Sequence, residues 1–242
     1  MSAHTAQGAR GIVAGALSAA ADWLMEPAGH TERESGVAAT LQERPVVAVI
    51  GLAPRCGTTT VARGLGAELA LRDSGGACAV TSASACGGLP LGLPAAGRLA
   101  RTLAPVAAGG TRACGRLCLV RCEDRAALAG AILYLAPLVL DVADAEEAAT
   151  AAALADRVVL VAGPGTEPAL APVVSDSLAR VGPAPVVVLN RATQDETRWS
   201  GRAAMELPDS RMGAQLALAG REPRGELGRG LALLADVVGE GL

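Results

Sequence analysis

The sequence lacks lysine and phenylalanine altogether, and it contains one tyrosine and two tryptophans among 242 residues. A buried core must therefore be built from alanine, valine and leucine, and the hydrophobic content of 51% is enough for one large domain. All 21 basic residues are arginines. The net charge of -3 argues against a uniformly basic nucleic-acid-binding surface, so only a local arginine patch stays open, with solvated helix faces as the simpler interpretation.

Cysteine pairs with the spacing of zinc ligands are missing as well. No two cysteines are separated by two residues, and His4 and His30 have no second ligand near them in the sequence. We interpret most of the cysteines as small buried residues of a reducing, cytoplasmic protein, with Cys56 set apart by its place in the turn after the first strand. No apolar run reaches the roughly 18 residues of a membrane span, and the stretch 11–21, preceded only by Arg10, makes a poor signal peptide. The six cysteines are Cys56, Cys78, Cys86, Cys114, Cys118 and Cys122.

Three segments follow one another along the chain. Residues 1–26 contain a predicted amphipathic helix that Pro27 ends, residues 27–44 form a polar linker, and residues 45–242 form one domain. The helix could dock on its own domain, bind a partner or lie on a membrane. Its polar face offers Arg10 against Asp22 and Glu26, so docking or partner binding is favoured over a membrane surface.

Short runs of valine, leucine and isoleucine alternate with alanine-rich stretches throughout the domain. Their continuous hydrophobicity indicates strands that are buried on both faces. The alternation predicts an α/β fold with a doubly wound, mostly parallel sheet flanked by helices. The predicted strands are 46–50, 78–82, 117–120, 138–141, 158–162 and 186–190, with a weaker one at 203–207.

The first strand runs into a turn that ends in CGTTT, residues 56–60. Backbone N–H groups at such a turn, together with the N-terminus of the following helix, favour a bound phosphate. The P-loop pattern G-x-x-x-x-G-K-[ST] aligns with residues 52–59 and places Thr58 at the lysine position. As a bare motif the pattern therefore fails, and an ordinary strand–turn–helix with threonine caps would explain this segment alone.

Several segments in order resemble the ParA/MinD branch of P-loop ATPases over residues 45–238. GTTTVARGLGAELA (57–70) is similar to the start of the family's first helix, and APLVLDVADAEEAATAAALADRVVLVAGP (136–164) to its Walker B region. GPAPVVVLNRA (182–192) is similar to the strand that contacts adenine, and AAMELPDSRMGAQLALAGREP (203–223) to the C-terminal strand, Pro-Asp turn and helix. The resemblance implies a P-loop NTPase fold with ATP and Mg²⁺ as ligands.

The resemblance assigns roles to individual residues. Thr59 matches the Mg²⁺-ligating hydroxyl and Thr60 the next phosphate-contacting threonine, while Asp141 matches the Walker B carboxylate that acts on Mg²⁺ through water. Asn190 matches the amide that reads the base, and Arg191 is expected to pack on it. The loop residues expected around the phosphates are Arg55, Cys56, Gly57 and Thr58.

Three family positions depart from this pattern. Thr58 replaces the P-loop lysine, Ala53 replaces a second lysine that reaches across the family's ATP-bound dimer, and the segment 80–83 lacks the Asp that positions water. We therefore expect a pseudo-ATPase with weak or absent nucleotide binding, acting through a protein partner in partition, positioning or regulation, with a homodimer left open. The alternatives are a slow ATPase that uses Arg55 or a residue supplied by a partner, and a structural protein that has lost the ligand. Asp144 is expected to cap the next helix rather than to replace the missing carboxylate.

Overall fold

The computed structural model describes residues 44–73, 76–81, 98–103, 111–114, 116–122, 124–142, 145–192 and 197–239. The predicted helix in 1–26, nearly all of the linker 27–44, the end of the predicted second strand at Ser82 and the residue Asp144 lie outside these ranges. The elements are β1 Val46–Gly51, α2 Thr58–Arg72, β2 Ala77–Thr81, α3 Arg98–Leu103, β3 Thr111–Cys114, β4 Leu117–Arg121, α4 Arg125–Ile132, β5 Leu138–Val142, α5 Ala145–Leu154, β6 Arg157–Ala162, α6 Leu170–Leu178, β7 Val186–Ala192, η1 Thr197–Trp199, β8 Met205–Pro208, α7 Arg211–Leu218 and α8 Gly225–Gly239.

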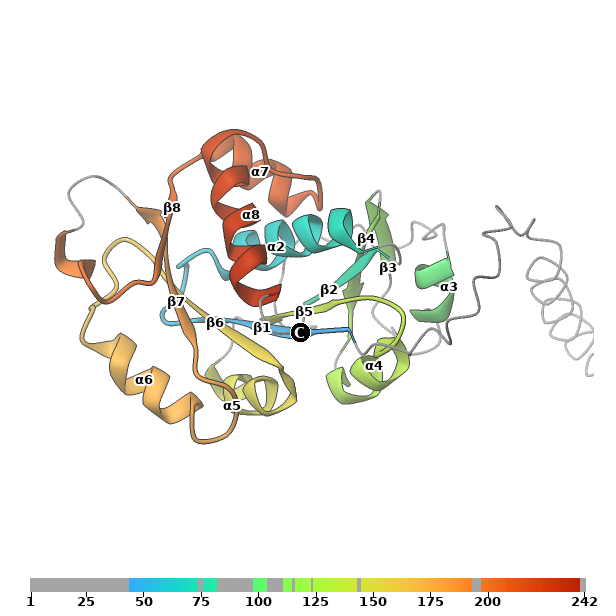
Figure 1. Ribbon diagram of the computed structural model, residues 1–242, viewed down its shortest axis with the longest axis horizontal. Coiled ribbons are helices and arrows are strands. Elements are labelled where there is room, and N and C mark those ends of the chain that lie inside the picture. Colours follow the sequence, from blue (N-terminus) through green and yellow to red (C-terminus); the bar gives the residue numbers. More distant parts are fainter. Residues whose placement is uncertain are drawn as a thin grey trace, which may run out of the picture. The chain divides into compact units, whose positions relative to one another are not determined.

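The described strands form one eight-stranded sheet in the order β3-β4-β2-β5-β1-β6-β7-β8. Every neighbouring pair is parallel except β3 and β4, which are antiparallel. Helices α2, α7 and α8 cover one face, and α4, α5 and α6 cover the other (Figure 1). The predicted α/β fold with a mostly parallel sheet between helices is therefore confirmed.

The core is divided by the sheet into two apolar layers. Along β5, Val139 packs in the layer beneath α2, while Leu140 and Val142 pack in the layer beneath α4 and α5. Side chains alternate between the faces of a strand, so Asp141 faces the α2 side. Strands β1, β5 and β6 have buried residues on both faces, which explains their nearly continuous hydrophobic sequences.

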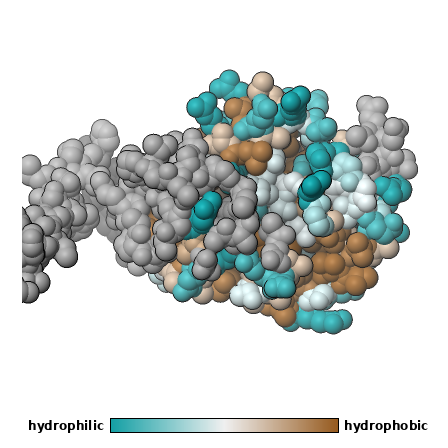
Figure 2. Space-filling view, turned by 180° about the vertical axis from the view of Figure 1, so that it is seen from behind, coloured by the Kyte–Doolittle hydropathy of each residue, from teal (hydrophilic) through white to brown (hydrophobic). Residues whose placement is uncertain are grey.

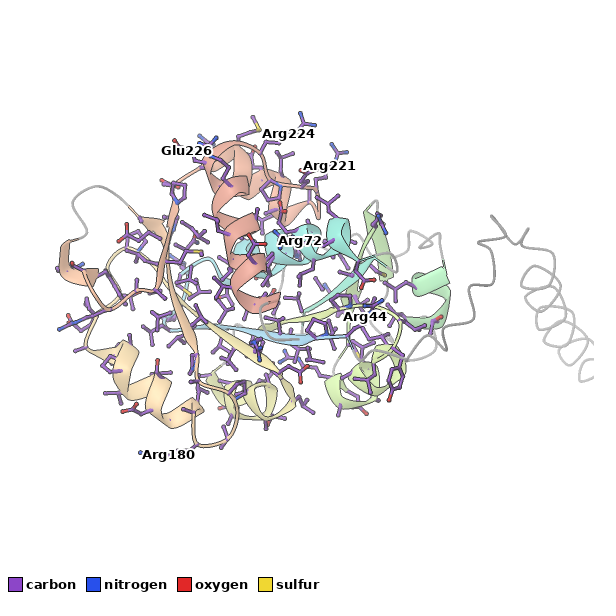
Figure 3. The ribbon with its side chains drawn as sticks, in the orientation of Figure 1. Arg44, Arg72, Arg180, Arg221, Arg224 and Glu226 are labelled. Atoms are coloured by element: carbon purple, nitrogen blue, oxygen red, sulfur yellow. The ribbon has the colours of Figure 1, made fainter. Side chains whose placement is uncertain are left out.

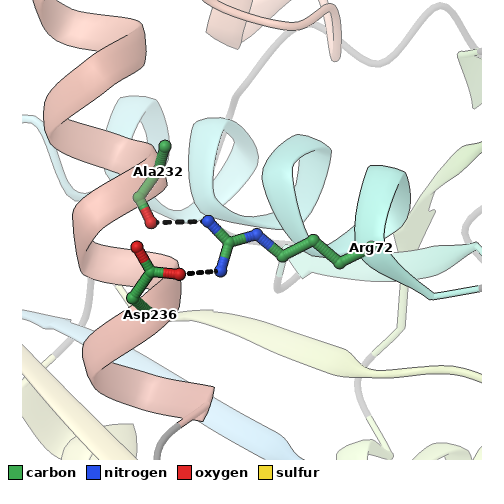
Figure 4. A network of polar contacts seen from close by, with 3 residues as sticks. All are labelled: Arg72, Ala232 and Asp236. Carbon is green, nitrogen blue, oxygen red and sulfur yellow. Dashed lines mark hydrogen bonds and ion pairs between the residues drawn. The ribbon is translucent and has the colours of Figure 1, made fainter.

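Helix α2 lies tightly between the sheet and the C-terminal helices. A Cβ atom on Gly64 would stand 2.6 Å from Leu231 Cδ1 of α8, and one on Gly66 would stand 3.1 Å from Leu117 Cδ1 of β4. At its C-terminal end, Arg72 donates hydrogen bonds to Asp236 Oδ1 at 2.5 Å and to the carbonyl of Ala232 at 2.7 Å (Figure 4). These contacts fix α2, whose first turn follows the candidate phosphate loop, against α8.

The strand β3 at Thr111–Cys114 was missed by the sequence prediction. Its residues TRAC contain neither a hydrophobic run nor a clear apolar alternation, and it pairs only with β4 as an edge strand. A short edge strand needs little hydrophobicity because it is covered less than a central one. The weak strand predicted at 203–207 is present as β8, displaced to Met205–Pro208.

The surface carries apolar side chains on α6 and dispersed arginines. Leu170 and Val173 of α6 and Val181 just after it are exposed. Figure 2 shows an apolar patch at the lower right of the described part of the molecule. The labelled Arg180 lies at the opposite end of the view from Arg221 and Arg224 (Figure 3). None of the helices in the described ranges has the length and apolar character that crossing a bilayer requires.

Candidate functional site

The turn between β1 and α2 has two residues in the left-handed region. Arg55 has a φ of 63° and Gly57 a φ of 90°. A Cβ atom on Gly57 would stand only 2.2 Å from Asn190 Nδ2. Both the positive φ and this close contact therefore disfavour any residue other than glycine at position 57. The amide of Leu52 donates to the carbonyl of Val161 at 2.8 Å, and this bond ties the start of the loop to β6.

Helix α2 begins without a side-chain cap. Gly57 is the N-cap residue, no acidic residue lies in the first turn, and the first backbone bond runs from Val61 N–H to the carbonyl of Gly57 at 3.1 Å. The amides at the start of a helix have no intrahelical acceptors, and the helix dipole adds partial positive charge there. The N-terminus of α2 is thus suited to an anion, as the sequence predicted.

Thr58, at the position of the P-loop lysine, turns into the loop. Its side chain is buried, and its Oγ1 lies 3.2 Å from the Sγ of Cys56, which is also buried. A Cβ atom on Gly51 would stand 2.6 Å from this hydroxyl, so the side chain lies over the end of β1. Position 58 therefore supplies neither a positive charge nor a hydroxyl directed away from the loop.

Two residues at the end of β7 hold the loop from the other side. Asn190 is buried and its Nδ2 donates to the carbonyl of Cys56 at 2.9 Å, while Arg191 Nη2 donates to the carbonyl of Arg55 at 2.8 Å. Arg191 has a φ of 58°, and the register of β7 with β8 shifts between Asn190 and Ala192. This irregularity lets both consecutive side chains reach the loop.

This loop-holding role was missed by the sequence reasoning, which gave Asn190 and Arg191 only a contact with the base. That base contact stays a prediction. The two hydrogen bonds join residues separated by 134 and 136 positions, so no local pattern could have revealed them. The only sequence signal was the asparagine at the end of a buried strand, because a buried polar side chain there needs a partner.

A cavity of about 210 Å³ adjoins the loop. It brings the predicted residues Arg55, Gly57, Thr60, Asn190 and Arg191 together with the turn that precedes α7. Its lining residues include two arginines, Arg55 and Arg191, and one acidic residue, Asp209, so their formal net charge is positive. The residues contributed from the C-terminal region are Pro208, Asp209, Ser210, Ala214 and Leu227.

The pair predicted to act on Mg²⁺ lies outside the lining of this cavity. Thr59 is half-buried in the first turn of α2. Asp141 is fully buried and sits beside Val49 of β1 and Thr81 of β2 in the sheet register. Both residues lie on the α2 side of the sheet near its carboxyl edge. Among the described residues, no three His, Cys, Asp or Glu side chains form a group that could hold a metal ion.

Comparison with known proteins finds similarity in structure only. No protein-family model matches the chain, and no curated protein matches it. An ATP complex of McdA from Cyanothece superposes with a TM-score of 0.57 at 14% identity, covering 82% of this chain and 97% of that one.

Two further solved structures give similar values. MinD from Aquifex aeolicus has a TM-score of 0.56 at 14% identity, covering 82% of this chain and 98% of its own. A putative plasmid partition protein from Borrelia burgdorferi, bound to AMPPNP, has a TM-score of 0.56 at 10% identity, covering 81% and 99%. The chain therefore has the fold of the ParA- and MinD-type P-loop ATPases.

Proposed function

We propose that this chain is a ParA/MinD-like nucleotide-binding protein that holds ATP weakly, does not hydrolyse it efficiently and acts through a protein partner in the cytoplasm. The observation that carries the proposal is the buried Thr58 side chain. It occupies the lysine position of a loop whose backbone is otherwise suited to phosphates. The site thus keeps the backbone part of a P-loop without its cation.

Three features support retained binding of a nucleotide. The free amides at the N-terminus of α2 fit the phosphates, and the adjoining cavity beside Asn190 and Arg191 fits part of the nucleoside. Thr59 and Asp141 are of the ligand types that Mg²⁺ takes, with Asp141 acting through water. A bound Mg²⁺ would neutralise phosphate charge, and Thr59 and Asp141 would hold the ion in place.

Two features argue against efficient turnover. A charge-assisted hydrogen bond contributes about 1.5–3 kcal/mol, so the absence of lysine weakens phosphate binding by about tenfold to a hundredfold. Removing one preorganised donor from a transition state commonly costs about 10²–10³ in rate. The segment 80–83 also lacks a carboxylate for the attacking water, and phosphoryl transfer depends almost wholly on positioning and charge.

A slow ATPase that uses Arg55 is the second candidate. Arg55 is exposed and lines the cavity, and its left-handed backbone places it at the tip of the loop. Its guanidinium could then replace the missing ammonium. In that case Arg55→Ala abolishes both ATP binding and hydrolysis, whereas unchanged ATP affinity in this variant removes the mechanism.

Calorimetric titration with Mg-ATP and a phosphate-release assay on the full chain test the main proposal. We expect measurable binding and phosphate release far below that of a working ParA-type enzyme. Rapid release that Asp141→Asn abolishes would overturn the proposal. If neither heat nor thermal stabilisation is seen with Mg-ATP, the chain is a structural protein that has kept the fold without its ligand.

Partner binding is part of the proposal because a chain that does not hydrolyse ATP efficiently would have to act by binding another protein. The MinC:MinD cell division protein complex from Aquifex aeolicus is among the structures with this fold, at a TM-score of 0.53. A homodimer is also compatible with the fold, although Ala53 removes the family's cross-dimer lysine. Co-purification with a candidate partner, with and without Mg-ATP, measures whether the nucleotide controls the association.

A further inference from the structure

A second cavity, of about 290 Å³, is lined by residues of α4 and α5. Both helices lie on the face of the sheet opposite α2 (Figure 1). Both helices begin after parallel strands, α4 after β4 and α5 after β5, so their first turns stand at the carboxyl edge of the sheet. None of the residues that line this cavity belongs to the candidate phosphate site. The lining residues are Asp124, Arg125, Ala126, Glu146, Glu147, Thr150, Ala151 and Leu154.

One partly buried ion pair bridges the two helices. Arg125 Nη2 donates to Glu147 Oε2 at 2.5 Å and more distantly to the backbone carbonyl of Asp141 at 3.4 Å. The Arg125 side chain is 8% exposed and that of Glu147 is 37% exposed. Adjacent helices usually pack closely, with their side chains interdigitated and their axes about 8–10 Å apart. Here a cavity lies beside the Arg125–Glu147 ion pair instead.

The charge of this cavity is unbalanced. Its lining residues include three acidic ones, Asp124, Glu146 and Glu147, and one arginine, which sum to a formal charge of minus two. Asp124 Oδ1 also accepts a hydrogen bond from the Ala127 amide and so caps α4. The Arg125 guanidinium is nearly fully buried and already bonded to Glu147 and to the carbonyl of Asp141. The accessible rim is thus acidic, while the remaining lining from Ala126, Ala151 and Leu154 is apolar. Nucleotides and anionic membrane surfaces are disfavoured here by charge.

The size restricts the occupant further. Pockets for drug-sized ligands span roughly 300–1,000 Å³, so a cavity at the lower end holds one or two side chains rather than a cofactor. Among the described residues no group of three His, Cys, Asp or Glu side chains is placed to hold a metal ion. A guanidinium or ammonium on an otherwise apolar segment matches both the acidic rim and the apolar lining.

We propose that the groove between α4 and α5 is a docking site for a basic, amphipathic segment of a partner protein. An arginine or lysine of that segment enters among Glu146, Glu147 and Asp124, and its apolar neighbours cover Ala151 and Leu154. The incoming cation competes with Arg125 for Glu147. Occupation is therefore expected to alter the link between α5 and the end of β5.

Fluorescence anisotropy with a short labelled peptide of arginine, leucine and alanine tests the docking site on the full chain. Thr150 lines the groove and is exposed, so it can be replaced by either an acidic or a basic residue. We expect Thr150→Glu to strengthen binding and Thr150→Arg to weaken it, by about two- to fivefold each, because exposed charge pairs contribute modestly. A peptide with glutamate in place of arginine should not bind the parent chain.

Ser177 on α6 provides the matched control, because it is exposed and outside the groove. Ser177→Glu and Ser177→Arg change the net charge equally and should leave the affinity unchanged. Hydrogen exchange should slow in α4 and α5 on peptide addition. The proposal is overturned if the parent chain does not bind the peptide, if the Ser177 and Thr150 variants respond alike, or if protection falls elsewhere. Self-association that Thr150→Arg abolishes would identify a second copy as the occupant and overturn the assignment to a partner.

Discussion

Restoring the missing lysine by Thr58→Lys should tighten the binding of Mg-ATP. The new ammonium gains a charge-assisted hydrogen bond to phosphate, worth about 1.5–3 kcal/mol. It loses the 3.2 Å contact between the Thr58 hydroxyl and Cys56 Sγ, a weak bond that contributes at most about 1 kcal/mol. The net gain of about 0.5–3 kcal/mol corresponds to an affinity about two- to 150-fold higher.

The lysine side chain of this variant must also move out of the buried space that Thr58 occupies. The Thr58 side chain is 7% exposed and lies against Gly51 and Cys56. A longer side chain cannot stay in that space, so it must follow the loop toward the N-terminus of α2. Without nucleotide this rearrangement should lower the free energy of unfolding by about 1 kcal/mol, the centre of the range for single substitutions, and bound Mg-ATP should more than recover the loss.

Calorimetric titration of the parent chain, Thr58→Lys and Thr58→Met separates charge from bulk, because methionine is long and uncharged. We expect a gain only for lysine. Phosphate release should stay low in all three chains, because the segment 80–83 still lacks a carboxylate. Equal ATP affinity in the lysine and methionine variants would refute the idea that a cation is the component this loop lacks.

Three other substitutions test the loop and the helix behind it. Gly57→Ala should destabilise the fold by about 1–3 kcal/mol in denaturant titrations, because φ is 90° and the new Cβ would stand 2.2 Å from Asn190 Nδ2; an unchanged midpoint would contradict this strained contact. Asn190→Ala should cost about 1–3 kcal/mol, because the carbonyl of Cys56 loses a buried donor; a stability equal to the parent's would mean that the bond contributes nothing. Burial, and secondarily the nearby Glu222, raise the pKa of Glu68 above its ordinary 4.5. The contribution of Glu68 to stability is therefore full below pH 4.5 and is lost as pH rises through the folded-state pKa. Glu68→Gln should raise the melting temperature at pH 7 and flatten its pH dependence, and an identical pH profile in the variant would show that Glu68 is not the group responsible.

Most of the sheet could be predicted because its strands are buried on both faces. The continuous apolar sequences at Val46–Gly51 and Arg157–Ala162 are typical of buried strands in a parallel sheet. The strand Thr111–Cys114 carries no such run, because it pairs on one side only. Its position depends on the neighbouring strand Leu117–Arg121 rather than on its own residues.

The candidate site could be predicted in composition but not in geometry. The threonine at position 58 was visible in the sequence, whereas its burial against Cys56 was not. The left-handed backbone of Arg55 and Arg191 is unusual for arginine and is set by tertiary contacts. The hydrogen bonds from Asn190 and Arg191 to the loop follow from the topology that places β7 beside β6 and β6 beside β1.

The two hydrogen bonds from β7 hold the candidate phosphate loop in its shape without a ligand. A loop that is ordered in advance loses little conformational entropy when it binds, so weak affinity here would reflect missing charge rather than a folding cost. A change of one codon at position 58 is therefore enough to place a lysine in this loop without rebuilding the backbone around it.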